Sequence, residues 1–90
     1  MRNSESFNNR DRLIQIGLSI AALRKYQGLS QEQLAEKAGI SRSFLSMIEN
    51  PNTVRAFSLD IFFNISDALN VNPSKLLAST LIPENDSSKP

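Results

Sequence analysis

The 90-residue sequence predicts an all-α domain. Apolar residues recur at helical steps of three and four, first at Leu13, Ile16, Ile20 and Leu23. Four later segments each begin with a Ser or Asn that suits an N-cap, flanked by two apolar residues spaced as a hydrophobic staple. No stretch sustains the period-two alternation that is typical of half-buried strands.

The first helix is expected from Arg10 to just before Gly28, since glycine suits a left-handed C-terminal cap. The polar residues 1–9 predict a flexible N-terminal arm, and residues 10–82 predict one folded domain that ends in a dimerisation helix. The polar, proline-flanked residues 83–90 predict a disordered tail.

Two short helices are expected next, separated by only a few residues. Ser30 and Gln33 form a capping box for the second helix, which stops at Gly39. Ser41 then caps the third helix at once, and this spacing is the geometry of a helix-turn-helix. Pro51 ends the third helix, where Asn50 tolerates the left-handed conformation of a cap.

The rest of the chain predicts a loop and two more helices. Residues 52–57 form the loop, and Ser58 caps a fourth helix with the inner stripe Leu59, Phe62, Ile65, Ser66 and Leu69. Asn72 caps a fifth helix that has Pro73 at its favoured first position.

The composition argues against catalysis. The chain has no Cys and no His, which removes thiolate metal sites and the commonest general base. No nucleophile–base pair, paired carboxylates or glycine-rich phosphate loop is evident, so we expect no enzyme, no cofactor, no metal and no small-molecule ligand. No apolar run reaches the roughly 20 residues of a membrane span, and the polar start resembles no signal peptide, so a cytoplasmic protein without membrane contact is expected.

Charge is unevenly distributed along the chain. The net charge is only +1, but residues 1–55 carry +3 and residues 56–90 carry −2. A positive front and a negative back suggest an anionic partner on one side. Chance explains charges this small equally well.

The segment "LSQEQLAEKAGISRSFLSMIEN", followed by "SLDIFFNISDALNV", resembles the Cro/cI-type (XRE) helix-turn-helix family of bacterial and phage regulators. The resemblance spans about residues 13–78. Around "RSFLSMIE" the sequence is especially similar to compact members of the family, including restriction–modification controller proteins. It implies a compact five-helix, lambda-repressor-like domain and a sequence-specific regulator of transcription. The motif does not separate controllers, phage repressors and antitoxins.

The sequence departs from the family's pattern at two places. Asn50-Pro51 stands where the family usually has glycine, and the loop "PNTVRAF" differs from the family's basic, proline-containing loop. The path from the third to the fourth helix is therefore the part least fixed by the resemblance.

In a helix-turn-helix the second helix lies in the major groove of double-stranded DNA, with its N-terminal residues at base edges. Here those residues are Arg42, Ser43 and Ser46, and Arg42 suits a bidentate contact to guanine. The resemblance implies that Gln31 binds a phosphate and orients the reading helix, and Gln31 is also a candidate for base contact. The full set of expected phosphate contacts is Gln31, Ser41, Asn50, Asn52, Thr53 and Arg55.

The remaining residues of the third helix have mixed roles. On a helical wheel Phe44, Leu45, Met47 and Ile48 fall on the apolar side, and Phe44 suits either packing at the core edge or DNA contact. The resemblance implies that Glu49 forms a structural ion pair with Arg24.

The resemblance also implies a homodimer on a twofold-symmetric operator. Apolar residues outside the inner stripe are candidates for the interface: Ile61, Phe63, Leu77, Leu81 and Ile82. Several of these residues could instead complete the core. Activation of transcription would need a contact with RNA polymerase. The alternative function is an antitoxin or other protein-interaction module, with the tail from Pro83 as the interacting segment.

Overall fold

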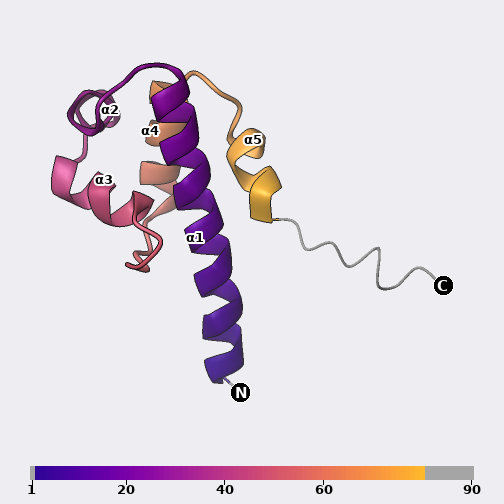
Figure 1. Ribbon diagram of the computed structural model, residues 1–90. Helices are drawn as coiled ribbons and strands as arrows, with labels where there is room; N and C mark the ends of the chain where they lie inside the picture. Colours follow the sequence, from indigo (N-terminus) through magenta and orange to yellow (C-terminus); the bar gives the residue numbers. More distant parts are fainter. Residues whose placement is uncertain (1, 81–90) are drawn as a thin grey trace.

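The computed structural model describes residues 2–80 of the chain (Figure 1). The helices are α1 (Arg2–Tyr26), α2 (Gln31–Ala38), α3 (Arg42–Glu49), α4 (Leu59–Ala68), α5 (Pro73–Leu77) and the 3-10 helix η1 (Ala78–Thr80). No strand occurs within these described residues, so the all-α prediction is confirmed. The expected tail over residues 83–90 lies outside the described part.

The long α1 forms the spine of the domain. Helices α2 and α3 lie on one side of it and α5 lies on the other (Figure 1). The fully buried core side chains come from all five α-helices: Ile20, Leu34, Leu45, Ile65, Leu69 and Leu76. Within residues 2–80, no helix is both long enough and apolar enough to cross a membrane.

The helix starts predicted from capping residues are confirmed. The hydroxyls of Ser30, Ser41 and Ser58 each accept a hydrogen bond from the third residue of their helix, and Asn72 caps α5 through Ser74 N. Ser30 and Gln33 complete the reciprocal capping box. These bonds satisfy backbone donors that a helix start leaves unpaired, which is why the sequence marks each start so clearly.

The start of α1 differs from the prediction, because the helix begins at Arg2 and not at Arg10. The expected N-terminal arm over residues 2–9 is therefore helical. Apolar periodicity begins only near Leu13, shortly before the core residue Ile16, so the pattern gave no sign of the helix before it. No glycine or proline precedes Gly17, so nothing in the backbone stops α1 from extending beyond the rest of the domain (Figure 1).

The predicted inner stripe of α4 is wrong at one position. Phe62, Ile65, Ser66 and Leu69 are buried as expected, whereas Leu59 is 69% exposed. Leu59 is the first residue of α4, and it lies about 70° around the helix from the centre of the buried stripe at 100° per residue. Its apolar side chain is therefore left on the surface.

Candidate nucleic-acid interface

Helices α2 and α3 form the expected helix-turn-helix, joined by Gly39, Ile40 and Ser41. Gly39 has φ 74°, a left-handed conformation that glycine adopts without steric cost. The turn is closed by the N–H of Ile40, which donates to the Ala35 carbonyl at 3.0 Å. This turn fixes how α3 leaves α2 and so which side of α3 faces outward.

The two sides of α3 differ in burial. Leu45, Ile48 and Glu49 are buried, whereas Arg42 and Ser43 are exposed and Ser46 is half-buried. The three expected base-reading residues therefore lie on the accessible part of the helix, with Ser46 closest to the protein body.

Met47 is 37% exposed, so its predicted place on the apolar side is wrong. It lies one turn after Ser43 and only about 40° from it around the helix axis. Angular position outweighs hydrophobicity here, since the buried stripe of α3 is already filled by Leu45, Ile48 and Glu49. Met47 thus joins the accessible side as an apolar group among polar ones.

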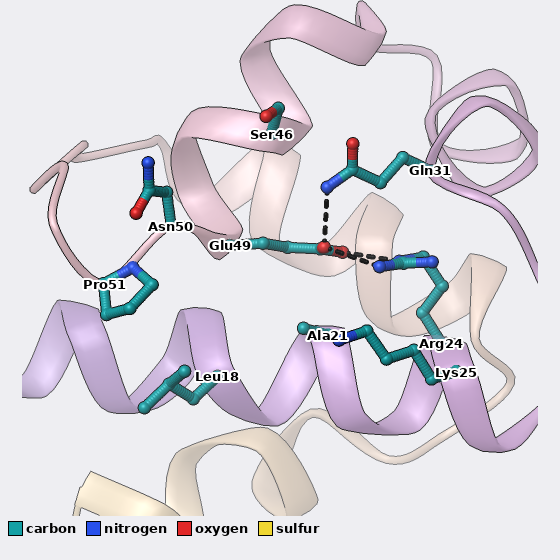
Figure 2. A pocket seen from close by; sticks show the side chains of 9 residues that line it. All are labelled: Leu18, Ala21, Arg24, Lys25, Gln31, Ser46, Glu49, Asn50 and Pro51. Atoms are coloured by element: carbon teal, nitrogen blue, oxygen red, sulfur yellow. Dashed lines mark hydrogen bonds and ion pairs between the residues drawn. The ribbon is translucent and has the colours of Figure 1, made fainter.

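The expected ion pair between Arg24 and Glu49 is present and bidentate. Arg24 Nε donates to Glu49 Oε2 at 2.8 Å, and Arg24 Nη2 donates to Glu49 Oε1 at 2.9 Å. Both residues are buried, and Arg24 Nη1 also donates to the Leu29 carbonyl at 2.8 Å. The pair joins the end of α1 to the end of α3 (Figure 2). The bond to Leu29 adds the connection before α2 to the same network.

Gln31 belongs to the same network. Its Nε2 donates to Glu49 Oε1 at 2.9 Å, and its side chain is half-buried (Figure 2). A carboxamide has a second N–H and an oxygen beyond this bond. Gln31 is therefore held in a fixed orientation with spare hydrogen-bonding groups, which is compatible with the expected DNA contact and does not test it.

Gly17 is a structural residue that the sequence reading missed. A Cβ added at Gly17 would collide with the carbonyl oxygen of Ile48 and would lie 3.1 Å from the Ile48 carbonyl carbon. The backbones of α1 and α3 therefore approach as closely as only glycine permits. The available signal was a glycine inside an otherwise strong helical pattern, which often marks a close packing contact.

A shallow pocket of about 340 Å³ opens between α1, the start of α2 and the end of α3. Its lining, drawn in Figure 2, is Leu18, Ala21, Arg24, Lys25, Gln31, Ser46, Glu49, Asn50 and Pro51. Three residues that are expected to contact DNA therefore line one pocket: Gln31, Ser46 and Asn50. Lys25 adds an exposed cation to that pocket that the sequence reading did not single out.

The connection after α3 takes a different path from the expected left-handed cap. Asn50 is extended, with φ −86° and ψ 114°, because the following proline disfavours other conformations of the residue before it. A turn replaces the cap: the Asn52 N–H donates to Asn50 Oδ1 at 2.9 Å, and the Thr53 N–H donates to the Asn50 carbonyl at 3.0 Å.

The same connection carries Arg55 back to α3. Its Cζ lies 5.1 Å from the centroid of the Phe44 ring. Phe44 is half-buried and packs against the core, which confirms the core-edge alternative for this residue. Arg55 itself is exposed.

The expected dimer residues fall into three groups. Phe63 and Leu77 are each 45% exposed, so both are accessible. Ile61 is half-buried and packs against the core, so its surplus apolar area is largely used within the domain. Leu81 and Ile82 lie outside the described residues. Leu59 is an exposed apolar residue of α4 that was not a candidate.

Over the described part of the chain, no group of three or more His, Cys, Asp or Glu residues is arranged to hold a metal ion. The accessible side chains of α3 offer hydrogen bonding, apolar contact and positive charge. These are the means by which proteins bind base edges and phosphates.

Comparison with known proteins places this geometry in context. A model of the helix-turn-helix family matches residues 20–76. The chain is 40% identical over 74 residues to the immunity repressor protein of Bacillus phage phi105, covering 77% of this chain and 47% of the repressor. It is also 40% identical over 62 residues to the HTH-type transcriptional regulator SinR of Bacillus subtilis, covering 69% of this chain and 55% of SinR. The chain thus spans about half the length of these relatives.

Two solved structures are similar in fold. The restriction-modification controller protein C.AhdI from Aeromonas hydrophila aligns with a TM-score of 0.67 at 34% identity, covering 71% of this chain and 94% of the controller. The clp gene regulator ClgR from C. glutamicum aligns with a TM-score of 0.68, covering 76% of this chain and 86% of ClgR. At 20% identity the second likeness concerns the fold alone.

Proposed function

The chain belongs to the helix-turn-helix family, and on that premise we propose that it is a sequence-specific double-stranded DNA-binding regulator of transcription. The observation that carries the proposal is the two-sided α3, whose buried side is locked into the domain while Arg42 and Ser43 stand exposed at its start. An eight-residue helix fixed in this way suits insertion into the major groove. The repressor and regulator names of its relatives support the same function.

We assign sequence reading to Arg42, Ser43 and Ser46, with Gln31 contributing from the start of α2. Arg42 presents a planar fork of donors that matches guanine O6 and N7. The phosphate contacts fall to Gln31, Ser41, Asn50, Asn52, Thr53 and Arg55, and the pocket adds Lys25. The Ser41 hydroxyl accepts the Phe44 N–H at 3.0 Å, which leaves its own hydrogen free to donate to a phosphate.

Met47 extends the reading surface with an apolar contact. An exposed side chain one turn beyond Ser43 would meet the groove floor, where the 5-methyl group of thymine is the apolar feature. Replacing thymine by uracil in the bound site removes only that methyl group. We expect one such replacement per half-site to lower the affinity of the natural protein for the site, and to leave the affinity of the Met47→Ala protein unchanged. Equal losses of affinity in both proteins would show that Met47 is not part of the reading surface.

We further propose a homodimer that binds a twofold-symmetric site, with half-sites about 34 Å apart. Phe63, Leu77 and Leu59 are the accessible apolar residues that support this assembly. Covering a promoter in this way would repress transcription, whereas activation would require an additional contact with RNA polymerase.

Selection from a random DNA pool, with sequencing of the retained fraction at several salt concentrations, tests the function. We expect an enriched twofold-symmetric site and an affinity that falls steeply with salt. Equal retention of all sequences would contradict sequence-specific regulation.

Three substitutions then divide the roles. Arg42→Ala should relax preference at one base of each half-site, and Arg55→Ala should weaken all sequences alike and lower the salt slope. Lys75→Ala is the matched control, because it removes an exposed cation from α5, on the far side of α1 from α3 (Figure 1). If all three variants behave identically, the assignment of residues is wrong.

A further inference from the structure

The contact between Arg55 and Phe44 joins two segments that the fold otherwise keeps separate. Arg55 lies in the connection before α4, thirteen residues after Arg42. Phe44 lies in the first turn of α3, and its backbone N–H is bonded to the Ser41 cap. The stack therefore places the loop cation beside the turn of α3 that carries Arg42 and Ser43.

The contact leaves the hydrogen-bonding capacity of the guanidinium unused. The group has five N–H donors, whereas the Phe44 ring contacts it through its π-system and offers no oxygen or nitrogen acceptor. Arg55 is exposed, and none of the hydrogen bonds or ion pairs found among the described residues involves its side chain. Its donors can therefore bind an anion without breaking the stack.

Phe44 is suited to act as the platform because it is itself fixed. The ring is half-buried and packs against the core, so its orientation is set by the domain. A long arginine side chain on a loop would otherwise lose several rotamers when it binds, at a cost in free energy. Holding the guanidinium over a fixed ring removes part of that cost before DNA arrives.

We propose that Phe44 is a positioning residue, which holds Arg55 by a cation–π contact so that its N–H donors meet a DNA phosphate next to the bases read by Arg42. This inference rests on the proposed function and concerns the same interface. It assigns to an apolar residue of α3 a role in phosphate binding that acts through another side chain.

A set of variants tests the inference on the DNA site selected by the natural protein. Phe44→Leu keeps an apolar side chain but removes the ring, and we expect affinity to fall about two- to fivefold, the size of an exposed cation–π contact. Phe44→Tyr keeps the ring face and should restore affinity. Arg55→Lys keeps the charge but loses the planar fork, so it should weaken binding while leaving the salt slope unchanged.

The double variant Phe44→Leu/Arg55→Ala is decisive, because Arg55→Ala removes the cation that a lysine would keep. If the two residues act through one contact, the double variant binds no more weakly than Arg55→Ala alone. Losses that simply multiply would overturn the proposal, as would a Phe44→Tyr protein as weak as Phe44→Leu.

Two controls separate other causes of failure. Thermal unfolding of each variant identifies a purely structural role, in which the unfolding temperature falls but affinity well below that temperature is unchanged; that result would also overturn the proposal. If the natural protein selects no site from the random pool, the proposed function fails. If it selects a site but Phe44→Leu binds that site normally, only the present inference fails.

Discussion

Single residues decide how α3 is held in this domain. Arg24, Glu49 and Gln31 form one buried and half-buried network at the end of α3, while Gly17 lets the backbone of α1 reach Ile48. Charge pairs taken out of water depend on complete hydrogen bonding, and here three side chains supply it. The far end of the reading helix is thus fixed by contacts that need particular residues.

Glu49→Gln should destabilise the domain strongly. The substitution keeps the shape of the side chain but leaves the buried Arg24 without its anion, which costs about 3–5 kcal/mol for a broken buried pair. Urea unfolding measures the loss. The exposed Glu36→Gln is the matched control and should change the free energy of unfolding by less than about 0.5 kcal/mol; similar values for both variants would show that the pair adds no stability.

Gly17→Ala should also destabilise, although alanine favours helices. The gain in helix propensity is about 1 kcal/mol, whereas the new methyl group meets the Ile48 carbonyl and forces α1 and α3 apart. Backbone shifts of this kind cost about 1–3 kcal/mol and sometimes more. We expect a lower unfolding temperature for Gly17→Ala and an unchanged or higher one for Ser19→Ala on the same helix; a stabilised Gly17→Ala protein would contradict the close contact.

At the level of elements, the sequence predicted the capped starts of α2 to α5 better than it predicted which side of each helix is buried. Ser30, Ser41, Ser58 and Asn72 cap where expected because a cap is a local feature, readable from a few neighbouring residues. Exposure depends on tertiary packing, and so the exposed Met47 was assigned to the apolar side.

The candidate site was predictable to a similar degree. The Arg24–Glu49 pair was expected from the family resemblance, and the accessible Arg42 and Ser43 from the geometry of a helix-turn-helix. The Phe44–Arg55 stack and the Gly17 contact were not, because each depends on the path of a chain segment in three dimensions. Apolar periodicity also gave no signal for the helical backbone of residues 2–9, because the apolar pattern starts only at Leu13.

The caps permit a prediction that separates stability from reading. Ser41→Ala and Ser58→Ala each remove one capping bond and should cost about 1 kcal/mol of stability. Ser41 lies at the start of the reading helix, so Ser41→Ala should also weaken DNA binding at a temperature where both variants are folded. Chemical unfolding and a binding titration measure the two effects. Equal affinity of the two variants would mean that DNA binding needs neither the cap on the first turn of α3 nor the proposed phosphate contact of Ser41.

At the scale of the whole molecule, the described residues leave apolar groups exposed on α4 and α5, while the outward side of α3 is polar except for Met47. Phe63 and Leu77 are accessible, and Asp60 and Asp67 place negative charge on α4. This arrangement supports self-association away from the DNA, because phosphates repel acidic groups.

Phe63→Asp should shift the protein towards monomer and reduce affinity for a symmetric site much more than for an isolated half-site. Burying a charge in an apolar interface is costly, so the substitution acts on association directly. Sedimentation at several concentrations, with and without DNA, measures the assembly. Asn64→Asp adds the same charge at a neighbouring exposed position of α4 as a control; a natural protein that stays monomeric throughout would remove the dimer.

The length of α3 has a consequence for the information that the molecule can read. Eight residues make a helix about 12 Å long at 1.5 Å per residue, and at 3.4 Å per base pair such a helix passes about four pairs. A four-pair sequence recurs by chance about once in 250 positions, against roughly a million or more competing sites in a genome. Two copies would read about eight pairs, a sequence expected about once in 65,000 positions. An address unique within a chromosome would therefore require neighbouring operators, or the shape of the DNA between half-sites, to supply the remaining information.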